Sequence, residues 1–264
     1  RCLKYKNMKY GLKIWSINKN LFKEAFNLVK NGAADFIELY TVPGSLDEKD
    51  LEIFKTVPVT LHAPHETHDF NIFSFDQSQI DFFNKQVAKI ADFLNSPYII
   101  LHAGVDRTGE GFNKNLFKEN TAKIYDKRIL IENLTKSAIG GGVCFGHSQE
   151  QLRFIKNDCG FDLCFDLVHA AKGAVEQKID YKDFIGEALA AFAPFYFHIC
   201  GTELVGRSED EHLNLFEGNF DMKWAKEKLA ELATEKDIWL VFEVPKIGNN
   251  LENDIKNIEF FKNL

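Results

Sequence analysis

The sequence lacks the features that mark several protein classes. Its five cysteines are odd in number and form no C-x-x-C pair, which argues against a disulfide framework or a cysteine-based zinc knuckle and favours the cytoplasm. No apolar run approaches the roughly 18 residues that a membrane-spanning helix needs. Residues 1–7 contain no apolar core of a signal peptide. We expect them to be a leader or a remnant that precedes one domain over residues 8–264.

The sequence also has little positive charge to offer a nucleic acid. It contains no run of lysine and arginine with interleaved aromatics, and its formal net charge is −7. Dedicated nucleic-acid binders usually carry a basic stripe. Bound metal ions are not part of that charge count, so it does not by itself exclude a nucleic-acid substrate.

What the sequence does contain is a regular succession of short apolar runs. The chain has 264 residues, of which 45% are hydrophobic, and a single-domain TIM barrel has roughly 250. The runs recur about every 25 to 40 residues, which is typical of a strand–helix repeat. They are Tyr10–Ile17, Phe36–Tyr40, Val57–His62, Tyr98–His102, Ile129–Glu132, Leu163–Asp166, Phe195–His198 and Ile238–Glu243.

Helical patterns lie between these runs. We expect Ser78 to cap one helix and Gly32 to end another. Ser148 and Gln151 have the spacing of a capping box. Strand–helix alternation without a proline-, glycine- or serine-rich linker predicts one α/β domain. An open doubly wound sheet usually has a glycine fingerprint after its first strand, and none is present here. We therefore predict a single-domain (β/α)8 TIM barrel.

Six consecutive runs finish with a histidine, aspartate or glutamate. In a barrel these positions converge on the C-terminal rim, where TIM-barrel active sites lie. Burying so many ionisable groups together is costly without a cation. Imidazole and carboxylate without thiolate suit zinc, manganese or iron. The six residues that predict a metal centre are His62, His102, Glu132, Asp166, His198 and Glu243.

Three more residues extend this set. His169 follows Asp166 by three residues, so the turn after the sixth strand can present both side chains to one cavity. Asp210 and His212 form a D-x-H motif in the long loop after the seventh strand. Alternate residues of an extended segment point the same way, so both can bind one ion.

With these residues, the sequence resembles the xylose isomerase-like TIM-barrel superfamily, and its ligand set is similar to that of endonuclease IV. The resemblance runs from about Val57 to Glu243. It implies three zinc ions, with Glu132 shared between the first and the second. The implied groups are His62, His102 and Glu132; Glu132, Asp166, His198 and Glu243; and His169, Asp210 and His212.

Three segments depart from the nuclease members of that family. The first strand, G-L-K-I-W-S, lacks their glycine- and histidine-containing pattern. The loops T-V-P-G-S-L-D-E-K-D and L-T-K-S-A-I-G-G-G-V differ from the loops that carry DNA recognition in the nucleases. The resemblance therefore implies the metal chemistry more strongly than the substrate. We expect a small phosphorylated or sugar substrate rather than abasic DNA, and the sequence contains no signal for an oligomeric state.

The first reaction that fits the ligands is hydrolysis of a phosphoester. Zinc would lower the pKa of water and neutralise charge on the phosphate, and Glu132 would lie between the ions. Three zinc ions and the four carboxylates leave a net charge of about +2, which suits a phosphate dianion.

The second reaction is isomerisation or epimerisation of a sugar or sugar phosphate with one manganese or similar ion. Glu132 and Glu243 would then exchange a proton at the carbon next to the carbonyl. This leaves His62, His102 and the D-x-H motif without a task, so we favour hydrolysis. A catalytically idle metal-binding protein is a third hypothesis.

Overall fold

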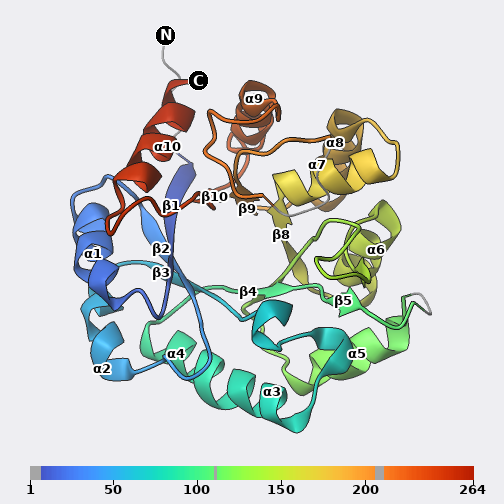
Figure 1. Cartoon of the computed structure of the whole chain (residues 1–264), viewed down its shortest axis with the longest axis horizontal. Helices are drawn as coiled ribbons and strands as arrows, with labels where there is room; N and C mark the ends of the chain where they lie inside the picture. Colours follow the sequence, from blue (N-terminus) through green and yellow to red (C-terminus); the bar gives the residue numbers. More distant parts are fainter. Residues whose placement is uncertain (1–6, 110–111, 206–210) are drawn as a thin grey trace.

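The computed structural model describes residues 7–109, 112–205 and 211–264. Within these residues, eight parallel strands close into a barrel with the order β1-β10-β9-β8-β6-β4-β3-β2 around the ring (Figure 1). The predicted TIM barrel is confirmed. The barrel strands are β1 (Met8–Trp15), β2 (Phe36–Tyr40), β3 (Val59–His62), β4 (Ile99–His102), β6 (Ile129–Glu132), β8 (Asp162–Asp166), β9 (Tyr196–Ile199) and β10 (Ile238–Phe242).

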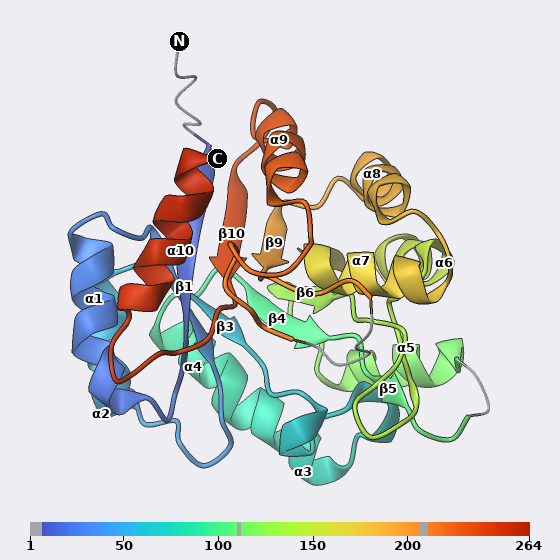
Figure 2. The same ribbon diagram turned by 45° about the horizontal axis from the view of Figure 1, so that its top comes forward.

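Helices alternate with the strands and surround the barrel (Figures 1 and 2). π-Helical turns join α3 to α4 and extend α6. In the described part of the chain, no helix is both long and apolar enough to cross a membrane. The helices are α1 (Phe22–Lys30), α2 (Glu48–Leu51), α3 (Gln77–Phe82), α4 (Ala88–Phe93), α5 (Lys114–Lys123), α6 (Gln149–Arg153), α7 (Leu167–Glu176), α8 (Tyr181–Phe192), α9 (Met222–Leu232) and α10 (Glu252–Asn263).

One helix starts with a different residue from the predicted one. The carboxylate of Asp76, not the hydroxyl of Ser78, caps α3 by accepting a main-chain N–H three residues on at 2.9 Å. Ser78 instead donates to Asp76 at 2.6 Å. An anionic cap is favoured because it also meets the positive end of the helix dipole. Gly32 follows α1 with a φ of 76°, and Ser148 caps α6, as predicted. The reciprocal half of the predicted capping box differs, because Gln151 Oε1 accepts from the main-chain N–H groups of Gly146 and His147.

The barrel interior changes from apolar to polar along each strand because alternate residues point inward. The N-terminal part of the interior is an apolar floor formed by Phe36, Ile100, Leu130, Cys164, Tyr196 and Val241. Two residues further along the same strands come Glu38, His102, Glu132, Asp166, His198 and Glu243. This second set forms a polar layer at the C-terminal rim.

Gly11 on β1 is required by the apolar floor. A Cβ atom at this position would lie 2.4 Å from the ring of Phe36, well inside van der Waals contact. The next inward residue of β1 is Lys13, which pairs in register with Glu38. On the first strand, the space beside Gly11 is therefore filled by the ring of Phe36, and Lys13 places a cation in the polar layer.

The segments after β4 and β6 form a short antiparallel ribbon. Its strands are β5 (Val105–Asp106) and β7 (Val143–Cys144). The run 140–142 consists of glycines with positive φ, and a Cβ on Gly142 would lie 2.8 Å from the carbonyl oxygen of Asp106. A run of three glycines in a sequence indicates either a mobile loop or a close approach of the backbone to another group. The structure shows that they form the turn into the ribbon.

Candidate metal centre

The polar layer brings together every predicted ligand that the structure describes. His62, Glu132, Asp166 and His198 are at most 1% exposed. His102 lies beside Glu132, and Asp210 lies outside the described residues. Potential ligand atoms form overlapping groups within 4.8 Å, namely Glu38, His62, His198 and Glu243; His62, His102 and Glu132; Glu132, Cys164 and His198; and Glu132, Asp166 and His169.

Glu132 at the end of β6 lies at the centre of these groups. Its Oε2 is 3.1 Å from His62 Nε2 and 3.4 Å from His102 Nε2. Its Oε1 faces the other side, 3.4 Å from His169 Nδ1 and 3.2 Å from His198 Nδ1. Each carboxylate oxygen therefore faces a different pair of imidazoles.

The hydrogen bonding of His62 fits a cation at this position. Its Nδ1 is 2.7 Å from the carbonyl oxygen of Ala63 and must carry the proton to donate there. Burial and the charge of Lys13 lower the pKa of His62, so the ring is neutral. Nε2 then presents a lone pair towards the Glu132 carboxylate. Two electron-rich groups facing each other in a buried site suit a shared metal ion.

Asp166 is held by the start of α7 and by Asn133. Its side chain accepts the main-chain N–H of His169 at 2.6 Å, and its own N–H donates to Asn133 Oδ1 at 2.7 Å. Burial raises the pKa of Asp166 to about 6, and the neighbouring Glu132 adds to the effect. Asp166 Oδ2 is buried and has no hydrogen-bond partner among the described residues, so its chemistry also fits a metal ligand.

His198 is oriented by a buried carboxylate. Its Nε2 donates to Glu38 Oε2 at 2.9 Å, which directs Nδ1 towards Glu132 and Glu243 at 3.2 and 3.1 Å. Tyr196 also donates to Glu38, at 2.8 Å, and accepts from Thr60 at 2.7 Å. A carboxylate behind a metal-binding histidine fixes its tautomer and raises its basicity.

Charged groups on the neighbouring strand β1 and on β9 stabilise the ionised form of Glu38. Burial opposes its ionisation, but the neighbouring His198 ring and Lys13 side chain lower the pKa of Glu38 to about 2. Burial likewise opposes the charge on Lys13, whereas Glu243 and Glu38 raise the Lys13 pKa. Lys13 Nζ contacts Glu243 and lies 3.3 Å from Glu38 Oε1. The layer is thus a network of alternating charges rather than a set of carboxylates alone.

His212 reaches the centre from the loop after β9. Its Nε2 is 3.3 Å from Glu243 Oε2, and its side chain is 39% exposed. The groups differ from those implied by the resemblance in two respects: His169 lies with Glu132 and Asp166, and His198 and Glu243 lie with Glu38 and His62. His169 and His212 still line one cavity.

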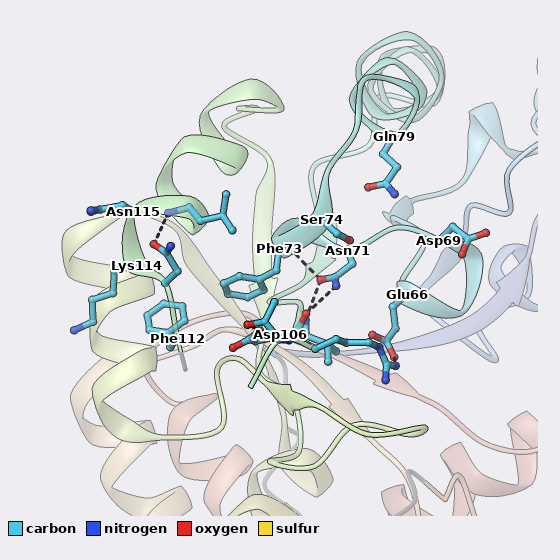
Figure 3. Close-up of a pocket in the computed structure, with 15 residues that line it drawn as sticks. Glu66, Asp69, Asn71, Phe73, Ser74, Gln79, Asp106, Phe112, Lys114 and Asn115 are labelled. Carbon is cyan, nitrogen blue, oxygen red and sulfur yellow. Dashed lines mark hydrogen bonds and ion pairs between the residues drawn. The ribbon is translucent and has the colours of Figure 1, made fainter. Parts of the chain in front are cut away.

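Two cavities open near this rim. The smaller, about 320 Å³, lies directly over the polar layer and is lined by Lys13, Trp15, His65, His102, His169, His212 and Glu243, among others. The larger, about 840 Å³, lies to one side, with Glu66 and Asp69 at one edge and Phe112 and Lys114 at the other (Figure 3). Only the smaller one touches the candidate ligands, so we take it as the substrate site despite its size.

Sequence analysis missed Lys13 and Glu38. It considered the residue that ends each apolar run, whereas Glu38 lies two positions before the end of β2 and Lys13 two before the end of β1. A signal was present, because Glu38 is the one charged residue of β2 and both side chains lie at the inward period of two. His65, which ends no apolar run and was not among the predicted site residues, stacks on His102 with ring centroids 4.9 Å apart.

Comparison with known proteins agrees with the barrel fold. The sequence pattern of the family described as xylose isomerase-like TIM barrel matches residues 9–264. The chain belongs to this family. No curated protein sequence matches the chain.

Among solved structures, this xylose isomerase-like chain is similar to both nucleases and epimerases. It matches a D-tagatose 3-epimerase-like protein with a TM-score of 0.69 and 19% identity, over 97% of this chain and 96% of the other. It matches endonuclease IV from Thermus thermophilus with a TM-score of 0.69 and 18% identity, over 97% and 98%. It matches the 3-keto-D-glucoside 4-epimerase YcjR from E. coli with a TM-score of 0.66 and 13% identity, over 97% and 100%. At these identities the likeness shows the fold alone.

Removing metal from this xylose isomerase-like barrel should lower its stability. Metal ions at a free concentration about a thousand times their dissociation constant add about 4 kcal/mol to the free energy of unfolding. For a domain of this size, that is a fall in Tm of roughly 8 to 16 °C. Thermal unfolding with and without a chelator measures the difference, and zinc added back should restore the original Tm. An unchanged Tm would show that the buried carboxylates are stable without a cation.

Proposed function

We propose that this chain is a metal-dependent phosphoester hydrolase with a multinuclear centre of three zinc sites, and that it acts on a small phosphorylated substrate. The two-sided environment of Glu132 carries the proposal. One oxygen faces His62 and His102 and the other faces His169 and His198. A single ion would not need both imidazole clusters, whereas ions on either side of Glu132 would use them all.

Bound zinc would supply a water of lowered pKa and positive charge opposite the phosphate. The chain's own residues prepare the site for that chemistry. Glu132 and Glu243 would hold the ions, and Glu38 would keep His198 Nδ1 directed towards them. Burial lowers the pKa of His65 to about 2. His65 therefore lines the cavity as a neutral ring.

The size of the cavity supports a small substrate. About 320 Å³ is near the lower end of the range for small-molecule sites. The acidic loop after β2 would offer little positive charge to a DNA backbone. Its acidic residues include Asp47, which caps α2, and Glu48, which already pairs with Lys89 at 2.6 Å. We therefore place abasic DNA below small phosphoesters as a substrate.

Elemental analysis combined with a substrate panel tests the proposed function. The purified holoprotein should contain more than one divalent ion per chain and should turn over at least one small phosphoester in a chelator-sensitive manner. The panel also includes ketoses and an abasic-site oligonucleotide at near-physiological salt. Efficient incision of the oligonucleotide at nanomolar enzyme would replace the small substrate with DNA.

Sugar isomerisation or epimerisation is the second candidate, and one contact favours it. Glu132 Oε1 and Glu243 Oε1 both lie close to His198 Nδ1, at 3.2 and 3.1 Å. One ion bound there could leave the two glutamates on either side of a sugar carbonyl, where they would exchange a proton. One ion per chain together with turnover of a ketose would establish this reaction instead.

Substituting His102 by alanine should separate these candidates. In the hydrolase, the variant loses a ligand on the Oε2 side of Glu132 and should contain about one ion fewer per chain. His147→Ala is the matched control, because His147 Nδ1 is bonded to the Cys144 carbonyl at 2.6 Å, away from the ligand groups. Its metal content should equal that of the wild type. Equal metal content in both variants would favour the single-ion enzyme.

A further inference from the structure

Lys13 reaches both the polar layer and the cavity with its ammonium group. Its ammonium contacts Glu243 and lies 3.3 Å from Glu38 Oε1, and its side chain is 12% exposed. It also lines the 320 Å³ cavity together with the candidate ligands. An ammonium group has three donors and no lone pair, so it cannot ligate a metal. Its place among the ligands calls for a different role.

Glu38 can hold Lys13 in place independently of Glu243. Glu38 Oε2 is already used by His198 and Tyr196, at 2.9 and 2.8 Å. Glu38 Oε1 has no hydrogen-bond partner among the described residues and is the oxygen nearest Lys13 Nζ on that side chain. An ion that takes Glu243 as a ligand would therefore leave Lys13 paired with Glu38, with its other N–H donors available to the cavity.

Lys13 also changes the net charge of the proposed metal centre. Three zinc ions would carry six positive charges, and the four predicted carboxylate ligands, of which Asp210 lies outside the described residues, would together with Glu38 carry five negative ones. Lys13 raises the excess from one positive charge to two. Two positive charges balance a phosphate monoester dianion. Charges interact more strongly in the low-dielectric interior than in water, so this balance favours binding of the dianion.

We propose that Lys13 binds an anionic oxygen of the substrate, so that this centre selects small molecules carrying a phosphate dianion. The inference rests on the proposed function, which it deepens by naming the group that is recognised. Lys13 enters the site from β1, which lies across the barrel from β6, the strand that carries Glu132. The substrate phosphate would lie between the ions and this ammonium.

Binding of inorganic phosphate to the zinc-loaded protein, measured by calorimetry, tests the inference. Lys13→Met should raise the Kd for phosphate roughly ten- to hundredfold, the effect of losing one charge-assisted hydrogen bond. Its metal content should stay at the wild-type level. Lys13→Arg keeps the charge and should restore most of the affinity. The matched control is Lys9→Met, on the same strand but at the far end of the barrel, where Lys9 pairs with Asp237 at 3.1 Å.

The outcomes separate this inference from the function on which it rests. An unchanged phosphate Kd at full metal content overturns the role of Lys13, even if the protein hydrolyses phosphoesters. Loss of metal in Lys13→Met also overturns it, because Lys13 would then act on the ions. Lys13-dependent phosphate binding without phosphoester turnover supports the inference and contradicts the hydrolase. Should Lys13→Met fail to fold, Lys13→Gln carries the same expectations.

Discussion

Replacing Glu132 by glutamine should lower kcat/KM by roughly a hundred- to several-thousandfold, the equivalent of the 3–5 kcal/mol that follows from breaking a buried charge pair. The variant keeps the shape of the side chain but loses the charge that both oxygens share with four histidines. Metal content should fall by more than one ion per chain, because ions on both sides lose a ligand. Steady-state kinetics and elemental analysis measure the two effects.

Asp126→Asn is the control for this variant. Asp126 lies just before the same strand, β6, at the opposite end of the barrel, and pairs with Arg128 at 2.6 Å. Its substitution should leave metal content and kcat/KM unchanged. Wild-type metal content in Glu132→Gln would show that Glu132 is not shared between ions.

Substituting Gly201 by alanine should both destabilise the protein and detach one ligand. A Cβ there would lie 1.9 Å from the carbonyl oxygen of Asn214, so the segment that carries His212 must move. Gly201 and Leu213 exchange both main-chain hydrogen bonds, at 2.9 and 3.0 Å. Overpacking of this kind costs about 1–3 kcal/mol, or roughly 2 to 12 °C in Tm. The displaced His212 should cost about one bound ion, which elemental analysis would detect.

Gly186→Ala provides the comparison for Gly201. Gly186 lies within α8, and a Cβ there meets nothing within 4 Å among the described residues. Alanine should stabilise this helix by about 0.5–1 kcal/mol and leave the ions in place. A Gly201→Ala protein with wild-type Tm and metal content would contradict the close packing of this loop.

The barrel and most of its polar rim could be predicted because both follow from local patterns. His62, His102 and Glu132 each end an apolar run, and parallel strands of a closed barrel must bring such ends together. Glu38 required a further step, the inward register of β2 relative to β1 and β3, which places it beside Lys13 and Thr60. That register depends on pairing between strands, which one strand's sequence does not contain.

Other features depended on competition between residues that are equally suitable in sequence. Asp76 and Ser78 can each cap a helix. In the structure Asp76 is the cap, and Ser78 donates a hydrogen bond to its carboxylate. The β5–β7 ribbon has only two residues in each strand, too few to produce an alternating pattern. The role of the glycines at 140–142 is visible only once Asp106 is next to Gly142.

The contact between Lys13 and Glu243 also has a consequence for the order in which the protein folds. These two residues are 230 positions apart and lie on the first strand and at the end of the last, which pair to close the barrel. Contacts of such high sequence separation form late, because the entropy of closing the chain must be met first. His62, His102 and Glu132 can meet before β10 is in place. Tight zinc retention would therefore report that the last strand has docked, and a slow final phase of zinc uptake during refolding would time that event.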